Sequence, residues 1–331
     1  MKQKQRTFFW LLALVVLAGG ALALLTRYNT RQQQAAEAAA EGSIPLCSFA
    51  LEELERIVCT NPSGTLTLDY KDGGWTLAGD PAYHLDATAC NTMATALSAL
   101  NAKRALTAEA GEDYGFDTPA ATVTVTAAGQ SSTFVFGAEN PVTGDVYLQK
   151  DGEAAVYTVS AAKLSCFTSS KEELFGTFQP SGLAASEIET LCYTHAGGET
   201  VRLIQVSEPA PQEDAGGDGA EDTEEPAYEN VWRLAGDTTV DLDQAQVQTM
   251  LSALCSYVSA QDTGANPADY GFDAPALTAE AKTAEQTLTL TYSVAADGCY
   301  LMVEGDSSVY TVNLSLVDAF PLTAQALEAA G

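Results

Sequence analysis

Histidine and basic residues are scarce in this chain of 331 residues. It contains two histidines, and 15 lysines and arginines stand against 44 aspartates and glutamates, which gives a formal net charge of −29 at pH 7. A surface with this excess of negative charge repels phosphate groups. We therefore exclude nucleic-acid binding and peripheral binding to anionic lipid headgroups.

The usual catalytic signatures are also missing. The sequence has no G-x-S-x-G elbow, P-loop, G-x-G-x-x-G or H-E-x-x-H motif. Neither His84 nor His195 has another ligand at metal-binding spacing, so we interpret both as solvated turn residues. Ser160 and Lys163 match the S-x-x-K pattern of some hydrolases, a match short enough to arise by chance. We expect no catalytic residue, no cofactor and no metal site.

Long apolar runs are absent except for one near the N-terminus. From Phe8 to Leu25 no residue is charged, and the indole of Trp10 is the only polar side-chain group. As a helix this run extends roughly 27 Å, and the hydrocarbon core of a bilayer is about 30 Å thick. We predict that it is a transmembrane helix and that it anchors the chain in a membrane.

The flanks of the run predict its orientation. Three basic residues precede it and favour a cytoplasmic N-terminus, with the bulk of the chain extracytoplasmic: Lys2, Lys4 and Arg6. A cleaved signal peptide is the alternative, because Ala21-Leu22-Ala23 has the form of a cleavage site. The run exceeds the usual signal-peptide core of about 7–15 residues, so we favour a retained single-pass anchor.

No C-x-x-C pair occurs among the seven cysteines, which argues against a zinc ribbon or a thioredoxin-type site. Their odd number leaves at least one unpaired within a monomer. Several fall at apolar positions of expected strands or helices, where a free thiol packs as a small hydrophobe. We favour reduced structural thiols, and a disulfide framework is the alternative.

The region after the run contains the same unit twice. The sequence D-Y-G-F-D-x-P-A begins at Asp113 and again at Asp269, Trp75 corresponds to Trp232, and V-Y-T-V recurs downstream. Such self-similarity indicates a tandem duplication. We divide the chain into a cytoplasmic tip with the transmembrane helix (1–31), a stalk (32–46), a first repeat (47–180), a second repeat (181–320) and a tail (321–331).

Each repeat has the same predicted order of elements. A β-hairpin comes first, then a helix that begins at Asp86 and ends near Asn101, then a meander of about four strands near 122–126, 133–136, 146–149 and 155–159. In the second repeat the helix is expected from Asp243 to Ser259. The predicted fold class is α+β, in which each repeat packs an antiparallel sheet on one helix.

An acidic insertion interrupts the hairpin of the second repeat at residues 208–229. It contains nine acidic residues, no basic residue and almost no apolar residue. This composition predicts a disordered hairpin tip. Calcium binding is the alternative, although the acidic residues lack the spacing of an EF-hand loop.

These elements together resemble a bacterial family, domain of unknown function 4340. The resemblance rests on the hairpin tryptophan, the helix after Leu-Asp, the Y-G-F-D-x-P-A element and the closing V-Y-x-V strand, and it covers nearly all of residues 47–320. It implies an N-terminal anchor and an auxiliary role beside an ABC-type transporter of the gliding-motility-associated kind. It transfers no catalytic residue.

The Y-G-F-D element has a structural interpretation as a chain corner. Gly115 permits a positive φ, Asp117 can accept from backbone N–H groups, and Pro119 can fix φ at the entry to an edge strand. The rings of Tyr114 and Phe116 are expected to pack under the helix. A ligand pocket at this corner is the alternative.

The sequence favours a membrane-tethered, extracytoplasmic scaffold or binding protein without enzymatic activity. Its expected partner is a protein of the cell envelope. Two alternatives stay open: a cell-envelope hydrolase with a cryptic site, and an acidic surface module that binds cations or polymers.

Overall fold

The computed structural model describes residues 44–109, 111–210 and 227–329 and divides into two compact units. Of the described residues, unit 1 comprises 44–78, 87–109 and 111–174, and unit 2 comprises 79–86, 175–210 and 227–329. The predicted transmembrane run from Phe8 to Leu25 lies outside the described residues. Within the described residues, no helix has both the length and the apolar character needed to span a bilayer.

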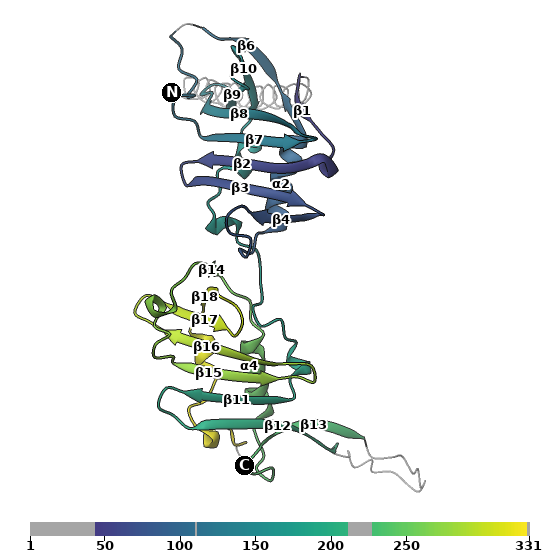
Figure 1. Ribbon diagram of the computed structural model, residues 1–331, viewed down its shortest axis with the longest axis vertical. Helices are drawn as coiled ribbons and strands as arrows, with labels where there is room; N and C mark the ends of the chain where they lie inside the picture. The colour runs from purple at the N-terminus through teal and green to yellow at the C-terminus, as the bar shows by residue number, and fades with distance from the viewer. Residues whose placement is uncertain (1–43, 110, 211–226, 330–331) are drawn as a thin grey trace, which may run out of the picture. The chain divides into compact units, whose positions relative to one another are not determined.

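Unit 1 is an eight-stranded antiparallel sheet with the strand order β4-β3-β2-β7-β8-β9-β10-β6 (Figure 1). The sheet strands are β2 (Leu54–Asn61), β3 (Gly64–Lys71), β4 (Gly74–Leu77), β6 (Arg104–Thr107), β7 (Ala121–Ala127), β8 (Gln130–Glu139), β9 (Asp145–Lys150) and β10 (Ala155–Ser160). A separate pair joins β1 (Ile44–Ser48) to β5 (Ala99–Ala102). The helices are α2 (Ala87–Ser98) and α3 (Ala161–Leu164), with 3-10 turns η1 (Leu51–Glu53), η2 (Ser165–Phe167) and η3 (Glu172–Leu174).

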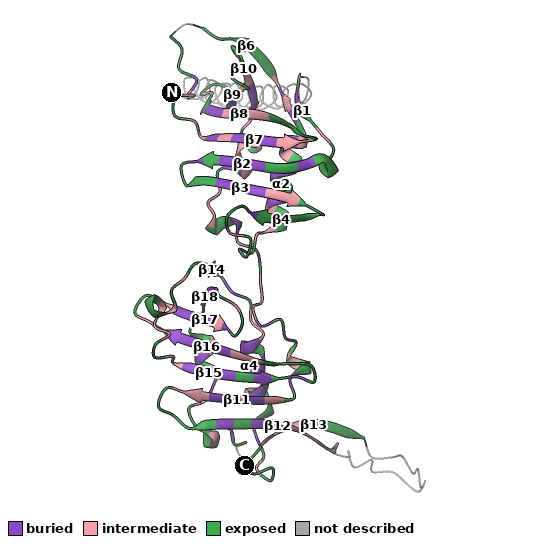
Figure 2. Ribbon diagram, in the orientation of Figure 1, coloured by how far each residue is buried: buried purple, intermediate pink, exposed green. Residues whose placement is uncertain are grey.

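Strand alternation decides which face of this sheet is buried. Ile57, Leu68 and Phe134 point to the face that α2 covers, and all three are fully buried. α2 contributes its own apolar side to the same core: Cys90, Met93, Ala94 and Leu97. The opposite face carries rows of threonine, such as Thr124 bonded to Thr133 across neighbouring strands (3.0 Å). Figure 2 shows the resulting alternation of buried and exposed residues along the strands.

Unit 2 repeats the architecture with the strand order β13-β12-β11-β15-β16-β17-β18-β14. Its strands are β11 (Thr190–His195), β12 (Thr200–Pro209), β13 (Tyr228–Leu234), β14 (Ala260–Asp262), β15 (Leu277–Lys282), β16 (Thr287–Val294), β17 (Cys299–Val303) and β18 (Val309–Val312). The helices are α4 (Gln244–Leu254) and α5 (Ser315–Asp318), with turns η4 (Ala185–Glu187), η5 (Pro267–Tyr270) and η6 (Ala324–Leu327). The Asp243 side chain caps α4 by accepting from two backbone N–H groups.

The predicted α+β class and the duplication are confirmed, but each sheet contains more than a hairpin and a four-strand meander. Strands β6 and β14, which the sequence analysis missed, pair with β10 and β18 at the edge of each sheet. The helices are also shorter than predicted: α2 ends at Ser98 and α4 at Leu254. In unit 1 the reason is that residues 99–102 extend to pair with β1, so their backbone bonds leave the helix.

The predicted limits of the repeats need correction at three places. The stalk was expected to run to residue 46, yet β1 begins at Ile44 and Leu46 is buried. The supposed tail contributes the fully buried Leu327 to the core of unit 2. The acidic insertion is narrower than 208–229, because β12 extends to Pro209 and β13 starts at Tyr228. Its residues 211–226 lie outside the described part of the chain.

Candidate functional site

The Y-G-F-D corner of unit 1 is a tightly packed backbone crossing. Gly115 has φ +77°, and a side-chain carbon there would lie 2.5 Å from the backbone nitrogen of Ala138. The N–H of Ala138 donates to the carbonyl of Tyr114 (2.8 Å). The carboxylate that accepts from the Gly115 N–H belongs to Asp113 (2.8 Å), whereas Asp117 is exposed. The predicted positive φ is confirmed, and the prediction that Asp117 is the acceptor in the turn is wrong.

The aromatic rings of this corner pack on the far face of the sheet and not under the helix. Tyr147 lies 5.0 Å from Tyr114, ring centre to ring centre, and Tyr114, Tyr147 and Val156 form a cluster apart from the main core. Strand alternation explains this, because Val146 and Leu148 take the helix side of β9 and turn Tyr147 to the other side. Pro119 also precedes β7, which is an interior strand and not an edge.

Unit 2 builds the same corner with different side-chain contacts. Gly271 has φ +79°, and the hydroxyl of Ser293 donates to the carbonyl of Tyr270 (2.7 Å). The Tyr270 hydroxyl donates to Asp262 (2.6 Å), and this bond raises the pKa of Tyr270 to about 12. The ring of Tyr270 meets Tyr300 edge to face at 4.8 Å. In both units the motif side chains are engaged in packing and hydrogen bonds, which accords with the structural interpretation of the corner.

His195 is a structural residue at the end of β11 and not a solvated turn residue. Its ring Nε2 lies 2.8 Å from the carbonyl oxygen of Phe320, which accepts the hydrogen bond. In unit 1 the amide of Asn61 donates to the carbonyl of the corresponding Phe167 (3.0 Å). The ring of His195 therefore does in unit 2 what an asparagine amide does in unit 1.

His84 stacks against an aromatic ring within unit 2. Its ring centre lies 3.6 Å from that of Phe178. Burial lowers the pKa of the imidazole below its ordinary value of 6.5, and the nearby carboxylate of Asp306 partly offsets this effect. Within the described residues, no group of three or more histidine, cysteine or acidic side chains is placed to hold a metal ion.

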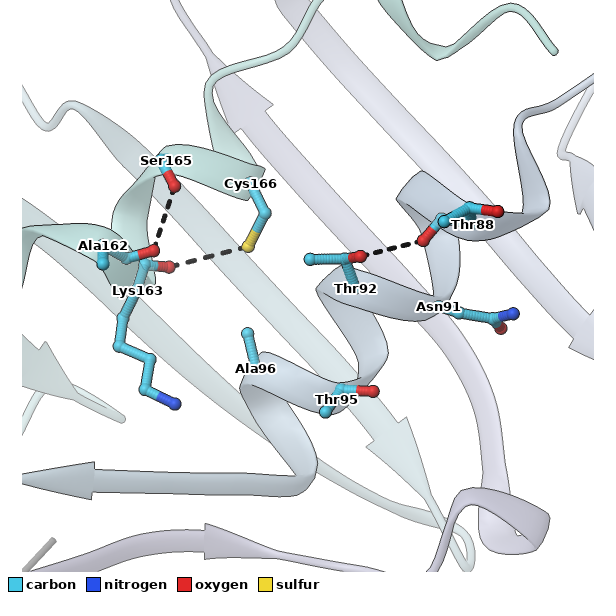
Figure 3. A pocket seen from close by; sticks show the side chains of 9 residues that line it. All are labelled: Thr88, Asn91, Thr92, Thr95, Ala96, Ala162, Lys163, Ser165 and Cys166. Atoms are coloured by element: carbon cyan, nitrogen blue, oxygen red, sulfur yellow. Dashed lines mark hydrogen bonds between the residues drawn. The ribbon is translucent and has the colours of Figure 1, made fainter.

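Lys163 and Ser160, the two residues of the S-x-x-K pattern, do not line the same groove. Lys163 lines a groove of about 520 Å³ between α2 and the turn that follows β10, whereas Ser160 is not among the lining residues (Figure 3). Small polar side chains make up the α2 wall: Thr88, Asn91, Thr92 and Thr95. Cys166 on the opposite wall donates to the carbonyl of Lys163, and burial raises the pKa of its thiol to about 11. Such a thiol is a weak nucleophile at neutral pH.

The edge strands β4 and β13 differ at their tryptophans. In both strands the hydrogen-bonding pattern turns the backbone N–H and C=O of the tryptophan away from the sheet. In unit 2 the side-chain amide of Gln244 holds both groups of Trp232: its oxygen accepts from the N–H (2.9 Å) and its nitrogen donates to the C=O (3.0 Å). Ala87 stands at the corresponding position of unit 1 and has no such amide.

Comparison with protein-family models gives one match that covers most of the chain. The model described as Domain of unknown function (DUF4340) matches residues 75–227 and 232–328. The chain belongs to this family. The searches of curated proteins and of solved structures returned no match. The expectation drawn from the Y-G-F-D resemblance is therefore confirmed for the family, whereas the segment expected to form an N-terminal anchor lies outside the described residues.

None of the seven cysteines of this DUF4340 protein, all of which lie in the described residues, forms a disulfide, and three are buried: Cys59, Cys90 and Cys299. Burial raises the pKa of Cys59 to about 12, and its Sγ donates to the same Phe167 carbonyl that Asn61 bonds. These thiols pack as small apolar groups, as the sequence predicted.

Two residues of structural importance escaped the sequence analysis. Asn61 bonds the backbone carbonyl of Phe167, 106 residues away in the sequence. Gln244 bonds the backbone of Trp232, 12 residues away. No sequence pattern indicates that a side-chain amide makes such a contact. Aligning the two copies residue by residue could have singled out Gln244, because it replaces Ala87 at the first helical position.

Proposed function

We propose that this DUF4340 protein is a membrane-tethered, extracytoplasmic scaffold or binding protein that serves an ABC-type transporter as an auxiliary subunit. The observation that carries this proposal is the pattern of difference between its two units. They share one fold and one internal corner, yet they differ at the exposed edge strand beside the helix. Duplication that keeps the core and varies the surface is what a protein needs to present two distinct binding surfaces.

The contacts of the candidate catalytic residues support a binding role over an enzymatic one. His195 holds a backbone carbonyl, His84 stacks on Phe178, and Lys163 lines an open groove without Ser160. A catalytic group needs a partner within hydrogen-bond reach that can move a proton. The three side chains serve packing or point into solvent, which favours the non-enzymatic proposal over a hydrolase.

The tether and the partner come from the sequence. The uncharged run from Phe8 to Leu25 supplies the anchor, with Lys2, Lys4 and Arg6 on the cytoplasmic side. The transporter is the partner that the family resemblance implies. The strongly acidic outer region keeps the protein soluble and away from anionic headgroups, so that its contacts are with protein.

Purification of the full chain from its own membranes in mild detergent tests the proposal. A permease and an ATPase should be recovered with it in constant ratio. Exposed-face variants that weaken this recovery should also impair transport, because the contact and not a reaction is the function. Recovery of the chain alone, together with unimpaired transport by those variants, would refute the proposal.

A further inference from the structure

The edge strand of the sheet in unit 1, β4, contains a residue whose backbone N–H and C=O groups are both unpaired within the described residues. The ladder between β3 and β4 includes the bond from the N–H of Ala78 to the carbonyl of Thr67 (2.8 Å). In an antiparallel pair the hydrogen-bonded residues alternate with those whose groups point outward. Trp75 is of the second kind. Neither its N–H nor its C=O has a hydrogen-bond partner in the part of the chain that the structure describes.

Unit 2 shows which chemistry fits this position. There one donor and one acceptor of a single amide, that of Gln244, bind the N–H and C=O of Trp232. A residue of an added antiparallel strand would offer the same two groups at the same spacing. The Gln244 side chain therefore occupies the place of one residue of an added strand and blocks the edge at Trp232, where an unpaired edge would be open to pairing with another chain.

In unit 1 the protective amide is absent and the site is exposed. Ala87, Gly74 and Thr76 are exposed, and Trp75 is half-buried where Trp232 is buried. The Trp75 indole donates to Asn91 on α2 (2.9 Å) and lies 4.8 Å from the ring of Tyr70. This aromatic pair provides an apolar surface beside the free backbone groups, on which the side chain of an added residue can pack.

We propose that β4 binds an extended polypeptide segment of a partner protein, with one backbone residue of that segment paired to Trp75. The segment adds a ninth strand to the sheet of unit 1. The residue that pairs with Trp75 places its side chain on the same face as the indole, above the small methyl of Ala87. This inference rests on the proposed binding function, for which it names the binding surface and the chemistry of the partner.

The decisive variant is Ala87→Gln, which gives unit 1 the residue that blocks unit 2. The matched control Ser252→Gln adds the same side chain at an exposed position of α4. A random twelve-residue peptide library is selected on the full wild-type chain in detergent, and the recovered peptides are measured against all three proteins. Affinity for Ala87→Gln should fall about tenfold or more, because two amide hydrogen bonds are lost. Affinity for Ser252→Gln should equal that for the wild type.

Amide hydrogen exchange reports on the same site without any peptide. The Trp75 N–H should exchange quickly in the wild type, slowly in Ala87→Gln, and slowly in the wild type with a selected peptide bound. The reciprocal variant Gln244→Ala should make the protected Trp232 N–H exchange at least about tenfold faster, since it loses its acceptor. These exchange rates also establish that the variants are folded.

The inference would be overturned if every selected peptide bound Ala87→Gln as tightly as it binds the wild type, or if the selection yielded no binding peptide at all. Failure here is distinct from failure of the proposed function. If Ala87→Gln still recovers the permease and ATPase, the scaffold proposal stands and the partner docks elsewhere. If neither chain recovers them while the peptides discriminate, the edge binds an extended segment and the transporter is the wrong partner.

Discussion

In unit 1 the edge strand β4 has four residues and the helix α2 begins with Ala87, whereas the corresponding strand of unit 2, β13, has seven residues and is held at Trp232 by Gln244. The cores differ less. Both units bury a helix against the same face of an eight-stranded sheet and cross the chain at the same glycine corner. The comparison teaches that the duplication preserved what each copy needs to fold and allowed the edges to diverge.

The corner glycines give the largest expected effect. Gly137→Ala should destabilise unit 1 by about 3 kcal/mol or more, because the added carbon would lie 2.1 Å from the carbonyl oxygen of Tyr114. At the equivalent position of unit 2, Ser293→Gly should cost only about 1–2 kcal/mol, the worth of one hydrogen bond plus the flexibility of glycine. Hydrogen exchange measured on proteolytic fragments of each variant shows in which unit the stability is lost. Equal losses in the two units would show that the corners are not packed differently.

The two side chains that hold the phenylalanine carbonyls come next. His195→Ala should destabilise unit 2 by about 1–3 kcal/mol, because it removes the donor to Phe320. Asn61→Ala should cost unit 1 at least as much: Cys59 still donates to Phe167, but the variant also loses the bond to the Ser169 carbonyl and the acceptor of the Ser63 N–H. Denaturant unfolding followed at each unit measures both. His195→Gln serves as the control that keeps a donor; if it were as unstable as the alanine variant, shape and not the hydrogen bond would explain the loss.

The blocked edge should contribute a smaller amount. Gln244→Ala should destabilise unit 2 by about 1–2 kcal/mol, because its amide bonds both backbone groups of Trp232. Ala87→Gln should leave unit 1 as stable as before or slightly more so. Thermal unfolding of the two variants beside the wild type checks this. A loss of stability in Ala87→Gln would mean that the edge of unit 1 cannot accept the amide as unit 2 does.

The smallest effect concerns pH and His84. Its folded pKa lies below 6.5 because of burial, so the folded chain binds this proton less readily than the unfolded chain. The stability that the neutral ring provides is complete above pH 6.5 and declines as the pH falls from 6.5 through the lower folded pKa. His84→Phe keeps a ring against Phe178 and should flatten this decline in a series of melting temperatures. An unchanged decline would assign the acid sensitivity to other groups.

Much of the fold could be predicted from the sequence because it depends on local patterns. Alternating apolar residues placed β3 and β7, the repeated corner placed the boundary between helix and meander, and the Trp75 and Trp232 correspondence revealed the duplication. The short strands β6 and β14 were missed, since strands of four and three residues carry too little alternation to recognise. The side on which Tyr114 packs was also missed, because that depends on the direction of Tyr147 in a strand distant in sequence.

The candidate site could be predicted only in part. The sequence analysis interpreted His84 and His195 as turn residues, and it could not show that one stacks on Phe178 and the other bonds Phe320. Those contacts join residues 94 and 125 positions apart in the chain. The edge site at Trp75 was not visible either, because a free N–H and C=O belong to every residue until the sheet register decides which are paired.

By itself the sequence determined the family, the duplication, the acidic surface and the one apolar run from Phe8 to Leu25, since each of these depends on composition or on repeated order. Only the tertiary structure decided which backbone groups stay unpaired at the edges. Ala87 and Gln244 occupy equivalent positions, yet the meaning of the difference appears only when the structure shows Gln244 bonded to the backbone of Trp232 and the register of β4 turns the backbone groups of Trp75 outward. Hydrogen bonds between distant segments depend on the register of the strands and on which segments come close together in the fold, and no local sequence pattern encodes either.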